Sequence, residues 1–229
     1  MAKQPTQHST SAPVDRIVNI QKPIGWSSND VIRFMRHRVP GVKVGHAGTL
    51  DPFAEGVLLV CLGRATKRAS QLMALEKQYN ATLEFGIETD TLDVSGAIVQ
   101  RDSEFQLQTE SLNAVVSQFV GVIEQTPPSF SAVHVNGQRA YQLAREGKDV
   151  KLQSRQVTIS ELNVIRVNTH SAELSIRCSK GTYIRSLARD IARELGTVAY
   201  LKKLSRVRIG DYDISNAISI MTLNTLNLF

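Results

Sequence analysis

Cysteine and long apolar runs are scarce in this sequence of 229 residues, and each scarcity excludes a class of protein. The two cysteines, Cys61 and Cys178, lie far apart in apolar runs, which argues against a disulfide framework and predicts core thiols. No apolar stretch approaches the roughly 20 residues of a membrane-spanning helix, and the polar start lacks the apolar block of a secretory signal. We therefore expect a cytoplasmic protein that does not contact membranes.

Several common site motifs are missing as well. The five histidines show no pairing at three to five residues and there is no C-x-x-C, so the sequence predicts no metal site. The phosphate loop G-x-x-x-x-G-K-[ST], a G-x-G-x-x-G after a strand and a G-x-S-x-G elbow are also absent. A nucleotide-driven or α/β-hydrolase mechanism is therefore not expected.

Positive charge, by contrast, is in excess. The chain has 27 Lys and Arg against 21 Asp and Glu, a net charge of +6. The basic residues gather in three clusters: Arg33, Arg36, Arg38 and Lys43; Arg64, Lys67 and Arg68; and Lys202, Lys203, Arg206 and Arg208. Any one cluster could be a solvated face, but together they favour a surface that tracks the phosphates of a nucleic acid.

Hydrophobic periodicity predicts a mixture of strands and helices. Strands are expected at residues 16–20, 56–63, 77–89, 96–100, 155–167 and 171–179, with the fourth as hairpin partner of the third. Helices are expected at residues 27–38, 64–75, 109–121 and 181–196. Residues 40–56 are predicted to be a loop. Because the order has no βαβ rhythm, the predicted class is α+β with a largely antiparallel sheet.

The domain organisation expected from composition is simple. Residues 1–13 are rich in Ser, Thr, Gln and Pro and are predicted to be a disordered tail. Residues 14–229 are predicted to be one domain. Within it, residues 127–152 contain two prolines, a short strand, an Asn-Gly turn and a short helix, and are predicted to leave the core as an excursion.

One carboxylate stands out, in "GHAGTLDP" at residues 45–52. Asp51 could simply bond nearby backbone N–H groups in a turn, which is the usual role of such an aspartate. However, Gly45 and Gly48 permit close approach of another backbone, and Pro52 restricts the geometry before it. Spacing and composition alone leave two interpretations open. Asp51 is either a turn residue or a carboxylate that the loop holds in a fixed direction for a functional role.

Five blocks resemble, in order, those of the TruB family of tRNA pseudouridine synthases, which act on the T-loop uridine at tRNA position 55. The blocks are "KPIGWSS", "VGHAGTLDPFAEGVLLVCLGRATK", "EKQYNATLEFG", "PPSFSAVHVNGQRAYQLAREG" and "KGTYIRSLARDIARELG". The resemblance covers about residues 16–210. It implies a pseudouridine synthase fold, with a central, mostly antiparallel sheet flanked by helices and crossed by an RNA-binding cleft. It also implies isomerisation of uridine to pseudouridine in the T-arm of tRNA, without cofactor or metal. We expect a monomer.

The resemblance also implies roles for individual residues. Asp51 matches the catalytic aspartate, as nucleophile or base. Arg185 matches the arginine that pairs with this carboxylate, and its alternative is an exposed helix arginine. Tyr79 matches the aromatic residue that stacks on the flipped base, although a strand tyrosine is more often core. Tyr183 matches a substrate-contacting position, or else packs at the start of a helix.

Other matches are less specific. His46 matches a histidine that takes the place of the flipped nucleotide or contacts the T-loop, although a lone loop histidine is usually surface. Leu204 matches an apolar residue that closes the pocket, with core packing as the alternative. Residues predicted to contact RNA phosphates, with structural or solvated roles as alternatives, are Lys22, Arg64, Lys67, Lys202 and Lys203.

The chain departs from the family pattern in several places. Trp26, Tyr200 and Ser205 stand where threonine, histidine and arginine are more usual. Residues 127–152 resemble the family's RNA-clamping thumb loop. We expect no C-terminal RNA-binding (PUA-like) domain after Phe229. A non-catalytic RNA-binding or tRNA-folding module on the same fold is the alternative function, and a guide-RNA-dependent relative is a third.

Overall fold

The computed structural model describes residues 15–131, 133–135, 137–148 and 152–225. Its framework is a large sheet in the order β14-β1-β3-β12-β4-β11-β10-β7, with β2 beside β3 and β13 beside β12. Its strands are β1 (Arg16–Lys22), β2 (Val44–Ala47), β3 (Glu55–Leu62), β4 (Lys77–Phe85), β7 (Gly121–Gln125), β10 (Arg155–Val167), β11 (Ser171–Cys178), β12 (Ala199–Ile209), β13 (Tyr212–Asp213) and β14 (Ile218–Ser219).

All neighbouring pairs in this sheet are antiparallel except β1 with β14 and β3 with β12. The helices are α1 (Ser28–Arg38), the 3₁₀ helix η1 (Gly63–Arg68), α2 (Ala69–Ala74), α3 (Thr109–Gln118), α4 (Ala140–Arg145), α5 (Ile184–Glu194), the 3₁₀ helix η2 (Ile214–Asn216) and α6 (Ile220–Thr225). The predicted α+β class with a mostly antiparallel sheet is confirmed. No helix in the described part of the chain is long and apolar enough to cross a membrane.

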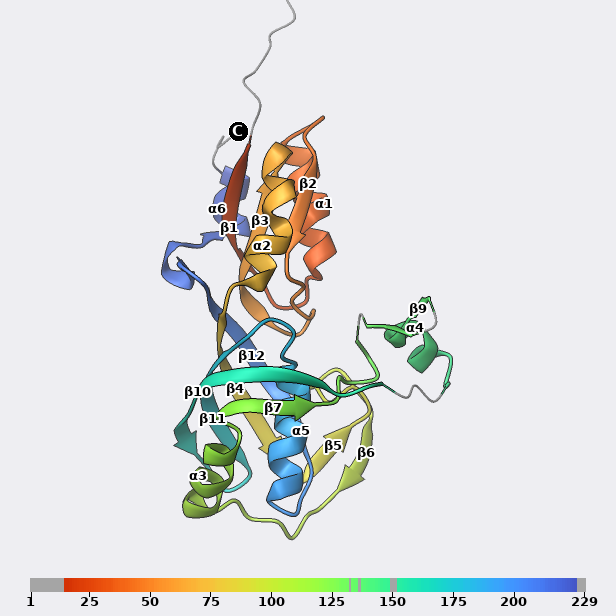
Figure 1. Ribbon diagram of the computed structural model, residues 1–229, viewed down its shortest axis with the longest axis vertical. Helices are drawn as coiled ribbons and strands as arrows, with labels where there is room; N and C mark the ends of the chain where they lie inside the picture. The colour runs from red at the N-terminus through yellow and green to blue at the C-terminus, as the bar shows by residue number, and fades with distance from the viewer. Residues whose placement is uncertain (1–14, 132, 136, 149–151, 226–229) are drawn as a thin grey trace, which may run out of the picture.

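The sheet has two halves, each with its own core (Figure 1). In the half that contains β3, α1 and α6 pack on one face, while η1 and α2 pack on the other. This burial on both faces explains the uninterrupted apolar run of β3, because no residue of a doubly covered strand faces water. Cys61 lies in this core and Cys178 in the other, both buried and free, as predicted.

In the other half, α3 and α5 cover one face of β4, β11 and β10. Here β11 alternates buried and half-buried residues, as a strand with one covered face does. The helix predicted at residues 181–196 contains α5, whose apolar side lies in this core, with Leu187 and Ile191 almost completely buried.

The two halves meet where β3 begins beside β12. The pairing is short, with Ser205 opposite Glu55 and Arg206 opposite Gly56. A Cβ atom on Gly56 would lie 2.3 Å from the backbone oxygen of Arg206, and its φ of +110° is left-handed. Glycine is therefore required at this crossing. The loop that contains Asp51 ends immediately before it.

Two local predictions were wrong, the loop over all of residues 40–56 and the unbroken strand at residues 77–89. The predicted loop at residues 40–56 contains β2, which pairs with β3 so that His46 lies opposite Val60. Gly45 inside this short strand weakens the alternating pattern, and the strand exists because β3 offers it an edge. The strand predicted at residues 77–89 is divided, because a turn at Gly86, with φ +81°, separates β4 from β5 (Ile87–Thr89). Its predicted hairpin pairing with residues 96–100 is confirmed at this end, where β5 pairs antiparallel with β6 (Ile98–Arg101).

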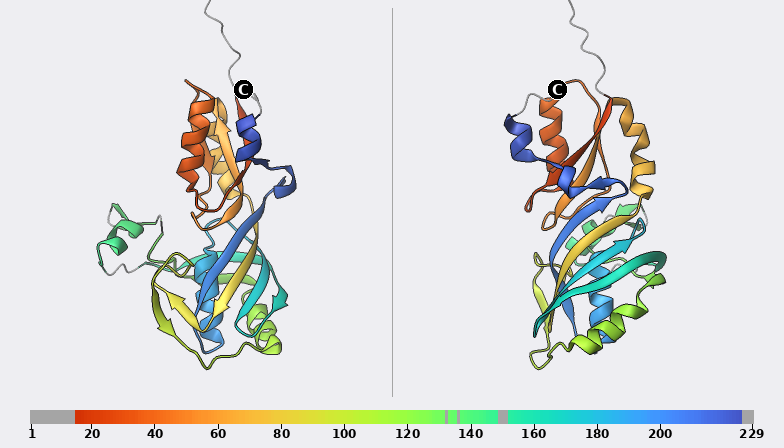
Figure 2. Two further views of the ribbon diagram at one scale, coloured as in Figure 1. Left: turned by 180° about the vertical axis from the view of Figure 1, so that it is seen from behind. Right: turned by 90° about the vertical axis from the view of Figure 1, so that its left-hand side faces the viewer.

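The described parts of the excursion predicted at residues 127–152 project from the body in Figure 1 and in the left view of Figure 2. It contains the short strands β8 (His134–Val135) and β9 (Gln138–Arg139) and then α4. Its base is closed by backbone hydrogen bonds from Ala140 to Val133 and from Tyr141 to Ser131, at 2.7 and 3.0 Å. The predicted disordered tail and Asn136 of the predicted turn lie outside the described residues.

Candidate active site

Asp51 lies in the loop between β2 and β3, at the junction of the two halves of the sheet. Ser28 at the start of α1 holds the preceding residue, because its hydroxyl is within 3.1 Å of the Leu50 carbonyl and accepts the Leu50 N–H at 2.9 Å. Leu50 and Ala54 are buried on either side of Asp51. The carboxylate therefore projects from a loop whose neighbours are fixed in the core.

Arg206 of β12 holds the backbone of this loop by hydrogen bonds. Its guanidinium donates to the carbonyls of Val57, Thr49 and Gly48 at 2.8, 3.2 and 3.1 Å, and the residue is 2% exposed. The basic cluster at residues 202–208 therefore contributes one member to the interior rather than to a phosphate-tracking surface. That part of the sequence prediction was wrong, since the buried guanidinium donates to three backbone carbonyls and does not face solvent.

Lys22 has a similar structural role. It is fully buried, and its ammonium group donates to the carbonyls of Trp26 and Pro23 at 2.6 and 2.9 Å and lies 3.5 Å from that of Pro52. Burial lowers the pKa of Lys22 to about 8, although the nearby Asp51 opposes the shift. The prediction of a phosphate contact by Lys22 was wrong, because the group is inaccessible; the structural alternative holds.

Replacing Arg206 with lysine should destabilise the protein by about 2–4 kcal/mol, because one ammonium cannot satisfy three separated carbonyls and the unpaired groups stay buried. Thermal or urea unfolding measures this change. Arg208→Lys is the matched control on the same strand, since Arg208 is half-exposed and pairs with Asp213 at 2.8 Å. Equal stabilities of the two variants would contradict the role assigned to Arg206.

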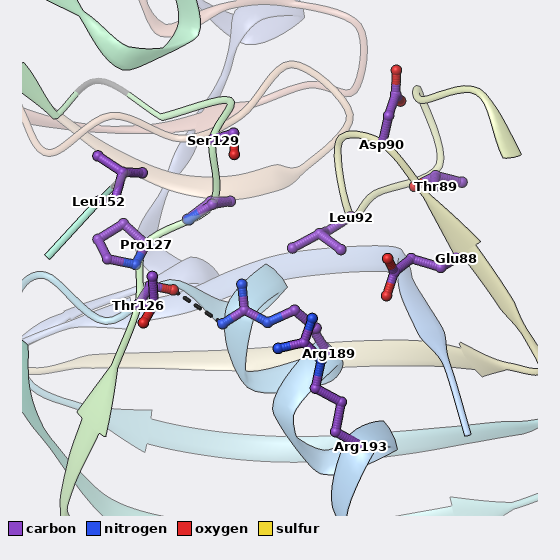
Figure 3. Close-up of a pocket in the computed structure, with 11 residues that line it drawn as sticks. Glu88, Thr89, Asp90, Leu92, Thr126, Pro127, Ser129, Leu152, Arg189 and Arg193 are labelled. Atoms are coloured by element: carbon purple, nitrogen blue, oxygen red, sulfur yellow. Dashed lines mark hydrogen bonds between the residues drawn. The ribbon is translucent and has the colours of Figure 1, made fainter. Parts of the chain in front are cut away.

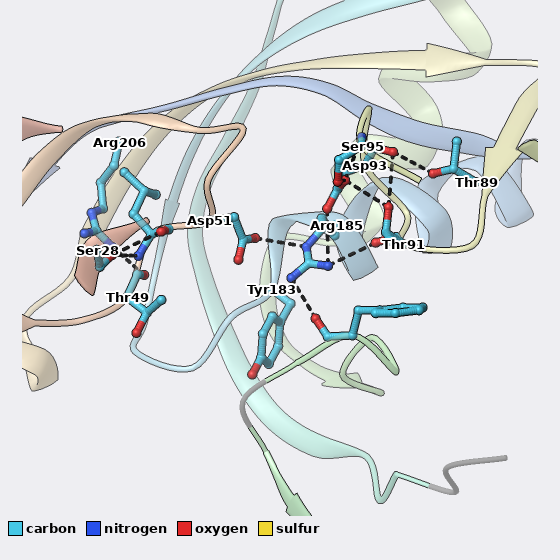
Figure 4. A network of polar contacts seen from close by, with 12 residues as sticks. Ser28, Thr49, Asp51, Thr89, Thr91, Asp93, Ser95, Tyr183, Arg185 and Arg206 are labelled. Carbon is cyan, nitrogen blue, oxygen red and sulfur yellow. Dashed lines mark hydrogen bonds and ion pairs between the residues drawn. The ribbon is translucent and has the colours of Figure 1, made fainter. Parts of the chain in front are cut away.

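Arg185, in the first turn of α5, pairs with Asp51 across the junction (Figure 4). Its Nε lies 3.0 Å from Oδ2 of Asp51, a distance of an ion pair, although the N–H does not point straight at the oxygen. The other guanidinium nitrogens donate to the carbonyls of Thr91 and Phe130 at 3.0 and 3.1 Å. The arginine side chain is 6% exposed, and that of Asp51 is 33% exposed. The alternative of an exposed helix arginine is therefore wrong.

Asp93 is a second carboxylate at Arg185, and the sequence analysis missed it. Its Oδ2 lies 3.4 Å from Nη1 of Arg185, and both side chains are 6% exposed. The Thr91 hydroxyl and the Ser95 N–H each donate to its other oxygen at 2.9 Å. Leu92 beside it has φ +60°, the one non-glycine residue with positive φ in the described chain. Such strain persists where the surroundings fix it, here between Thr91 and Asp93.

Burial raises the pKa of Asp51 above its ordinary value of 3.8, and the negative Asp93 adds to the shift. Arg185 and then Lys22 oppose it. Although a third of the Asp51 side chain reaches solvent, desolvation by the surrounding protein is the largest influence on this pKa. The site therefore holds a carboxylate whose charge depends on its arginine partner.

The raised pKa of Asp51 predicts how kcat/KM falls at acid pH. Protonated Asp51 is uncharged and loses its pairing with Arg185, so kcat/KM should fall as pH drops through the raised pKa and level off above it. Initial rates of product formation across a pH series measure the midpoint, with RNA binding followed at each pH as a control. A midpoint at or below 3.8 would contradict the buried environment described for Asp51.

Tyr79 and Leu204 lie close to the Asp51 loop but in the core. They are 8% and 7% exposed and belong to the same buried cluster as Leu50 and Ala54. Burial raises the pKa of the Tyr79 phenol, while Arg206 lowers it. Base stacking by Tyr79 and pocket closure by Leu204 stay predictions, since both side chains also serve core packing.

Tyr183 occupies the N-cap position of α5, two residues before Arg185, and its ring lies near the ion pair (Figure 4). Gln125 holds its backbone at both ends, accepting the N–H at 2.8 Å and donating to the carbonyl at 3.1 Å. The Arg155 guanidinium lies over its ring, 4.9 Å from the centroid. The Tyr183 residue is half-buried, and its predicted contact with the substrate stays a prediction.

His46 lies on β2, half-buried, and its Nδ1 has no hydrogen-bond partner among the described residues. Burial lowers its pKa, and the positive charge of Arg206 adds to the shift. The imidazole is carried by the strand that precedes the Asp51 loop. Its predicted contact with the RNA stays a prediction.

Four of the residues predicted to contact phosphates are exposed: Arg64, Lys67, Lys202 and Lys203. Arg64 already pairs with Asp15, and Lys202 with Glu84 at 3.0 Å. Glu84 raises the pKa of Lys202, first through this hydrogen bond. An RNA phosphate would have to compete with these carboxylates, whereas Lys67 and Lys203 form no ion pair within the described part of the chain.

A hollow of about 230 Å³ lies beside this site on α5 (Figure 3). Arg189, one turn beyond Arg185, donates to the Thr126 carbonyl at 3.1 Å and pairs with Asp190 at 2.8 Å. Neither Asp51 nor Arg185 lines the hollow. Within the described ranges, no group of three or more His, Cys, Asp or Glu side chains could hold a metal ion.

Comparisons with known proteins agree with this geometry. Residues 36–184 match the model of the TruB family pseudouridylate synthase (N terminal domain). The chain is 44% identical over 209 residues to a protein named tRNA pseudouridine synthase B from Caldanaerobacter subterraneus subsp. tengcongensis, covering 90% of this chain and 73% of that protein. A Bordetella pertussis protein of the same name is 41% identical over 215 residues, with 93% and 88% covered.

A chain in the crystal structure of a Cbf5-Nop10-Gar1 complex has a similar fold. The TM-score is 0.69 at 26% identity, and the match covers 90% of this chain and 52% of that one, so this chain spans about half of its structural relative. The family model covers more than half of the present sequence, and the relatives above exceed 40% identity over most of it. The chain therefore belongs to the TruB family of pseudouridylate synthases.

Proposed function

We propose that this chain isomerises uridine to pseudouridine in tRNA, at position 55 of the T-loop, and that residues 14–229 form its catalytic domain. The observation that carries the proposal is the ion pair between Asp51 and Arg185, 3.0 Å apart, formed by the two residues that match the family's catalytic aspartate and its arginine partner. The relatives named tRNA pseudouridine synthase B support tRNA as the substrate. Because tRNA is processed in the bacterial cytoplasm, we place the protein there.

The reaction moves one bond and balances without a second substrate. The bond between C1′ of the ribose and N1 of uracil breaks, the base rotates, and C1′ bonds to C5 instead. The hydrogen on C5 leaves as a proton, and N1 gains one. Composition and oxidation level are unchanged, so carboxylate chemistry and water suffice.

The arrangement of Asp51 and Arg185 suits this chemistry. Asp51 acts as the nucleophile, on the ribose or on the base, or as the base that removes a ribose proton. Arg185 keeps the carboxylate charged where desolvation opposes its ionisation, and Asp93 holds the guanidinium from the opposite side. The Asp51 side chain is one-third exposed, so a substrate can reach it.

A uridine within the folded T-loop must leave its stack to reach Asp51. Flipping a base costs a few kcal/mol, and stacking on an aromatic ring recovers about 1–3 kcal/mol. Tyr79 is the residue proposed for this stacking. Residues 127–152 would clamp the RNA as a thumb loop, and we expect one protein chain to bind one T-arm.

Position-specific mapping tests this proposal. Unmodified tRNA transcript is incubated with the protein and treated with a carbodiimide that marks pseudouridine, and reverse transcription then locates the modified base. The expected stop corresponds to position 55 and disappears when that uridine is replaced by cytidine. Binding without any modification would favour the non-catalytic module, and a stop elsewhere in the tRNA would overturn the T-loop assignment.

A further inference from the structure

A second RNA contact is suggested by an aromatic hollow at the start of α1. The hollow has a volume of about 410 Å³ and is lined by Gly25, Trp26, Asp30, Arg33, Phe34 and His37. The rings of Trp26 and Phe34 meet edge to face, with centroids 6.0 Å apart and an interplanar angle of 69°. Both rings are half-buried. The edge-to-face contact holds the Trp26 ring in one orientation while part of it stays open to solvent.

The surroundings of the hollow are basic. Arg33, Arg36 and His37 are exposed on α1. Among the residues that line the hollow, Asp30 is the one carboxylate. It is engaged within α1, because it accepts the backbone N–H of Ser27 at 2.8 Å in a capping box and pairs with Arg33. A partly exposed aromatic surface edged by cations suits a nucleotide, whose base stacks and whose phosphate carries negative charge.

The hollow adjoins the Asp51 loop through the backbone. The Gly25 N–H donates to the carbonyl of Pro52, the residue after Asp51, at 2.8 Å. Lys22 links the same two segments, since its ammonium donates to the Trp26 carbonyl at 2.6 Å and lies 3.5 Å from that of Pro52. In Figures 1 and 2, α1 lies on the same side of the molecule as the excursion that contains α4. An RNA held between the excursion and Asp51 would extend toward α1.

We propose that the hollow binds an RNA nucleotide next to the one at Asp51, with its base against Trp26 and its phosphate near Arg33, Arg36 and His37. This inference depends on the proposed RNA substrate. A protein segment is the less suitable occupant, because the hollow is small and its edge is positively charged rather than apolar. The stacking contact should strengthen RNA binding without taking part in the chemical step.

The composition of the chain provides a direct probe, because Trp26 is its sole tryptophan. A T-arm stem-loop is titrated into wild-type protein while tryptophan emission and its quenching by acrylamide are recorded. Binding of the same RNA is followed independently by anisotropy of a fluorescent label. The expected result is a change in Trp26 emission and protection from acrylamide, both saturating with the anisotropy signal.

Variants complete the test. Trp26→Leu should weaken RNA binding about tenfold while the single-turnover rate at saturating RNA is retained, and Trp26→Phe should recover most of the affinity. Ile165→Ala, at an apolar residue 56% exposed on β10, is the control and should change neither. RNA binding with unchanged Trp26 emission and accessibility would overturn the contact while leaving the proposed function intact. Absence of both RNA binding and product would overturn the proposed function as well.

Discussion

Replacing Asp51 with asparagine should reduce the rate of pseudouridine formation by on the order of 10⁴-fold or more, with little change in RNA affinity. The amide keeps the size of the side chain but cannot act as a nucleophile or as a base. The loop should stay in place, because its supports are backbone contacts to Ser28, Lys22 and Arg206 that do not involve the carboxylate. Single-turnover rates and filter binding measure the two quantities.

The same substitution should also affect stability only slightly. Removing the charge of Asp51 ends its pairing with Arg185, but it also relieves the desolvation that raises its pKa, and Asp93 still pairs with the guanidinium. Asp211→Asn, at an exposed residue, is the control for loss of one negative charge. A rate within tenfold of wild type for Asp51→Asn would contradict the assigned role.

The second large effect is expected at Arg185. Arg185→Lys should lower the single-turnover rate about 10²- to 10³-fold with RNA binding mostly retained. The guanidinium contacts the Asp51 carboxylate, the Asp93 carboxylate and two carbonyls at once, within 3.0–3.4 Å. A lysine ammonium keeps the charge but cannot reach all of these groups from one position, so Asp51 would lose its fixed partner.

A matched substitution on the same helix separates this effect from a general loss of charge. Arg189→Lys, one turn further along α5, replaces a guanidinium that donates to the Thr126 carbonyl and not to Asp51. Its rate should stay within a few-fold of wild type. Equal losses at Arg185 and Arg189 would show that the helix, rather than the ion pair, is what the reaction requires.

The sequence predicted those elements whose burial follows a simple rule. The apolar run of β3 and the amphipathic pattern of α5 were both identified, because each responds to the faces that neighbouring elements cover. β2 was missed because its pairing depends on the edge of β3, which lies beyond the reach of a local pattern. The general class followed from element order alone.

Local sequence patterns predicted less of the active site than of the fold. Spacing identified Asp51 as a carboxylate in a restricted loop, but only the family resemblance connected it with Arg185, since no periodicity relates residues on opposite halves of a sheet. Asp93 was not identified, because it lies in a polar, turn-like segment where an aspartate is common. Arg206 and Lys22 appeared to be surface cations, although the fold places both under the Asp51 loop, where backbone carbonyls satisfy them.

The central claim is that the wild-type protein moves the glycosidic bond of uridine from N1 to C5, a step that releases the hydrogen on C5. Transfer RNA transcribed with [5-³H]uridine provides the test, because every completed isomerisation liberates one tritium to water. The account predicts one equivalent of tritium released per tRNA, and none from a transcript with cytidine at position 55. Tight binding of the labelled tRNA with no release of tritium would contradict it.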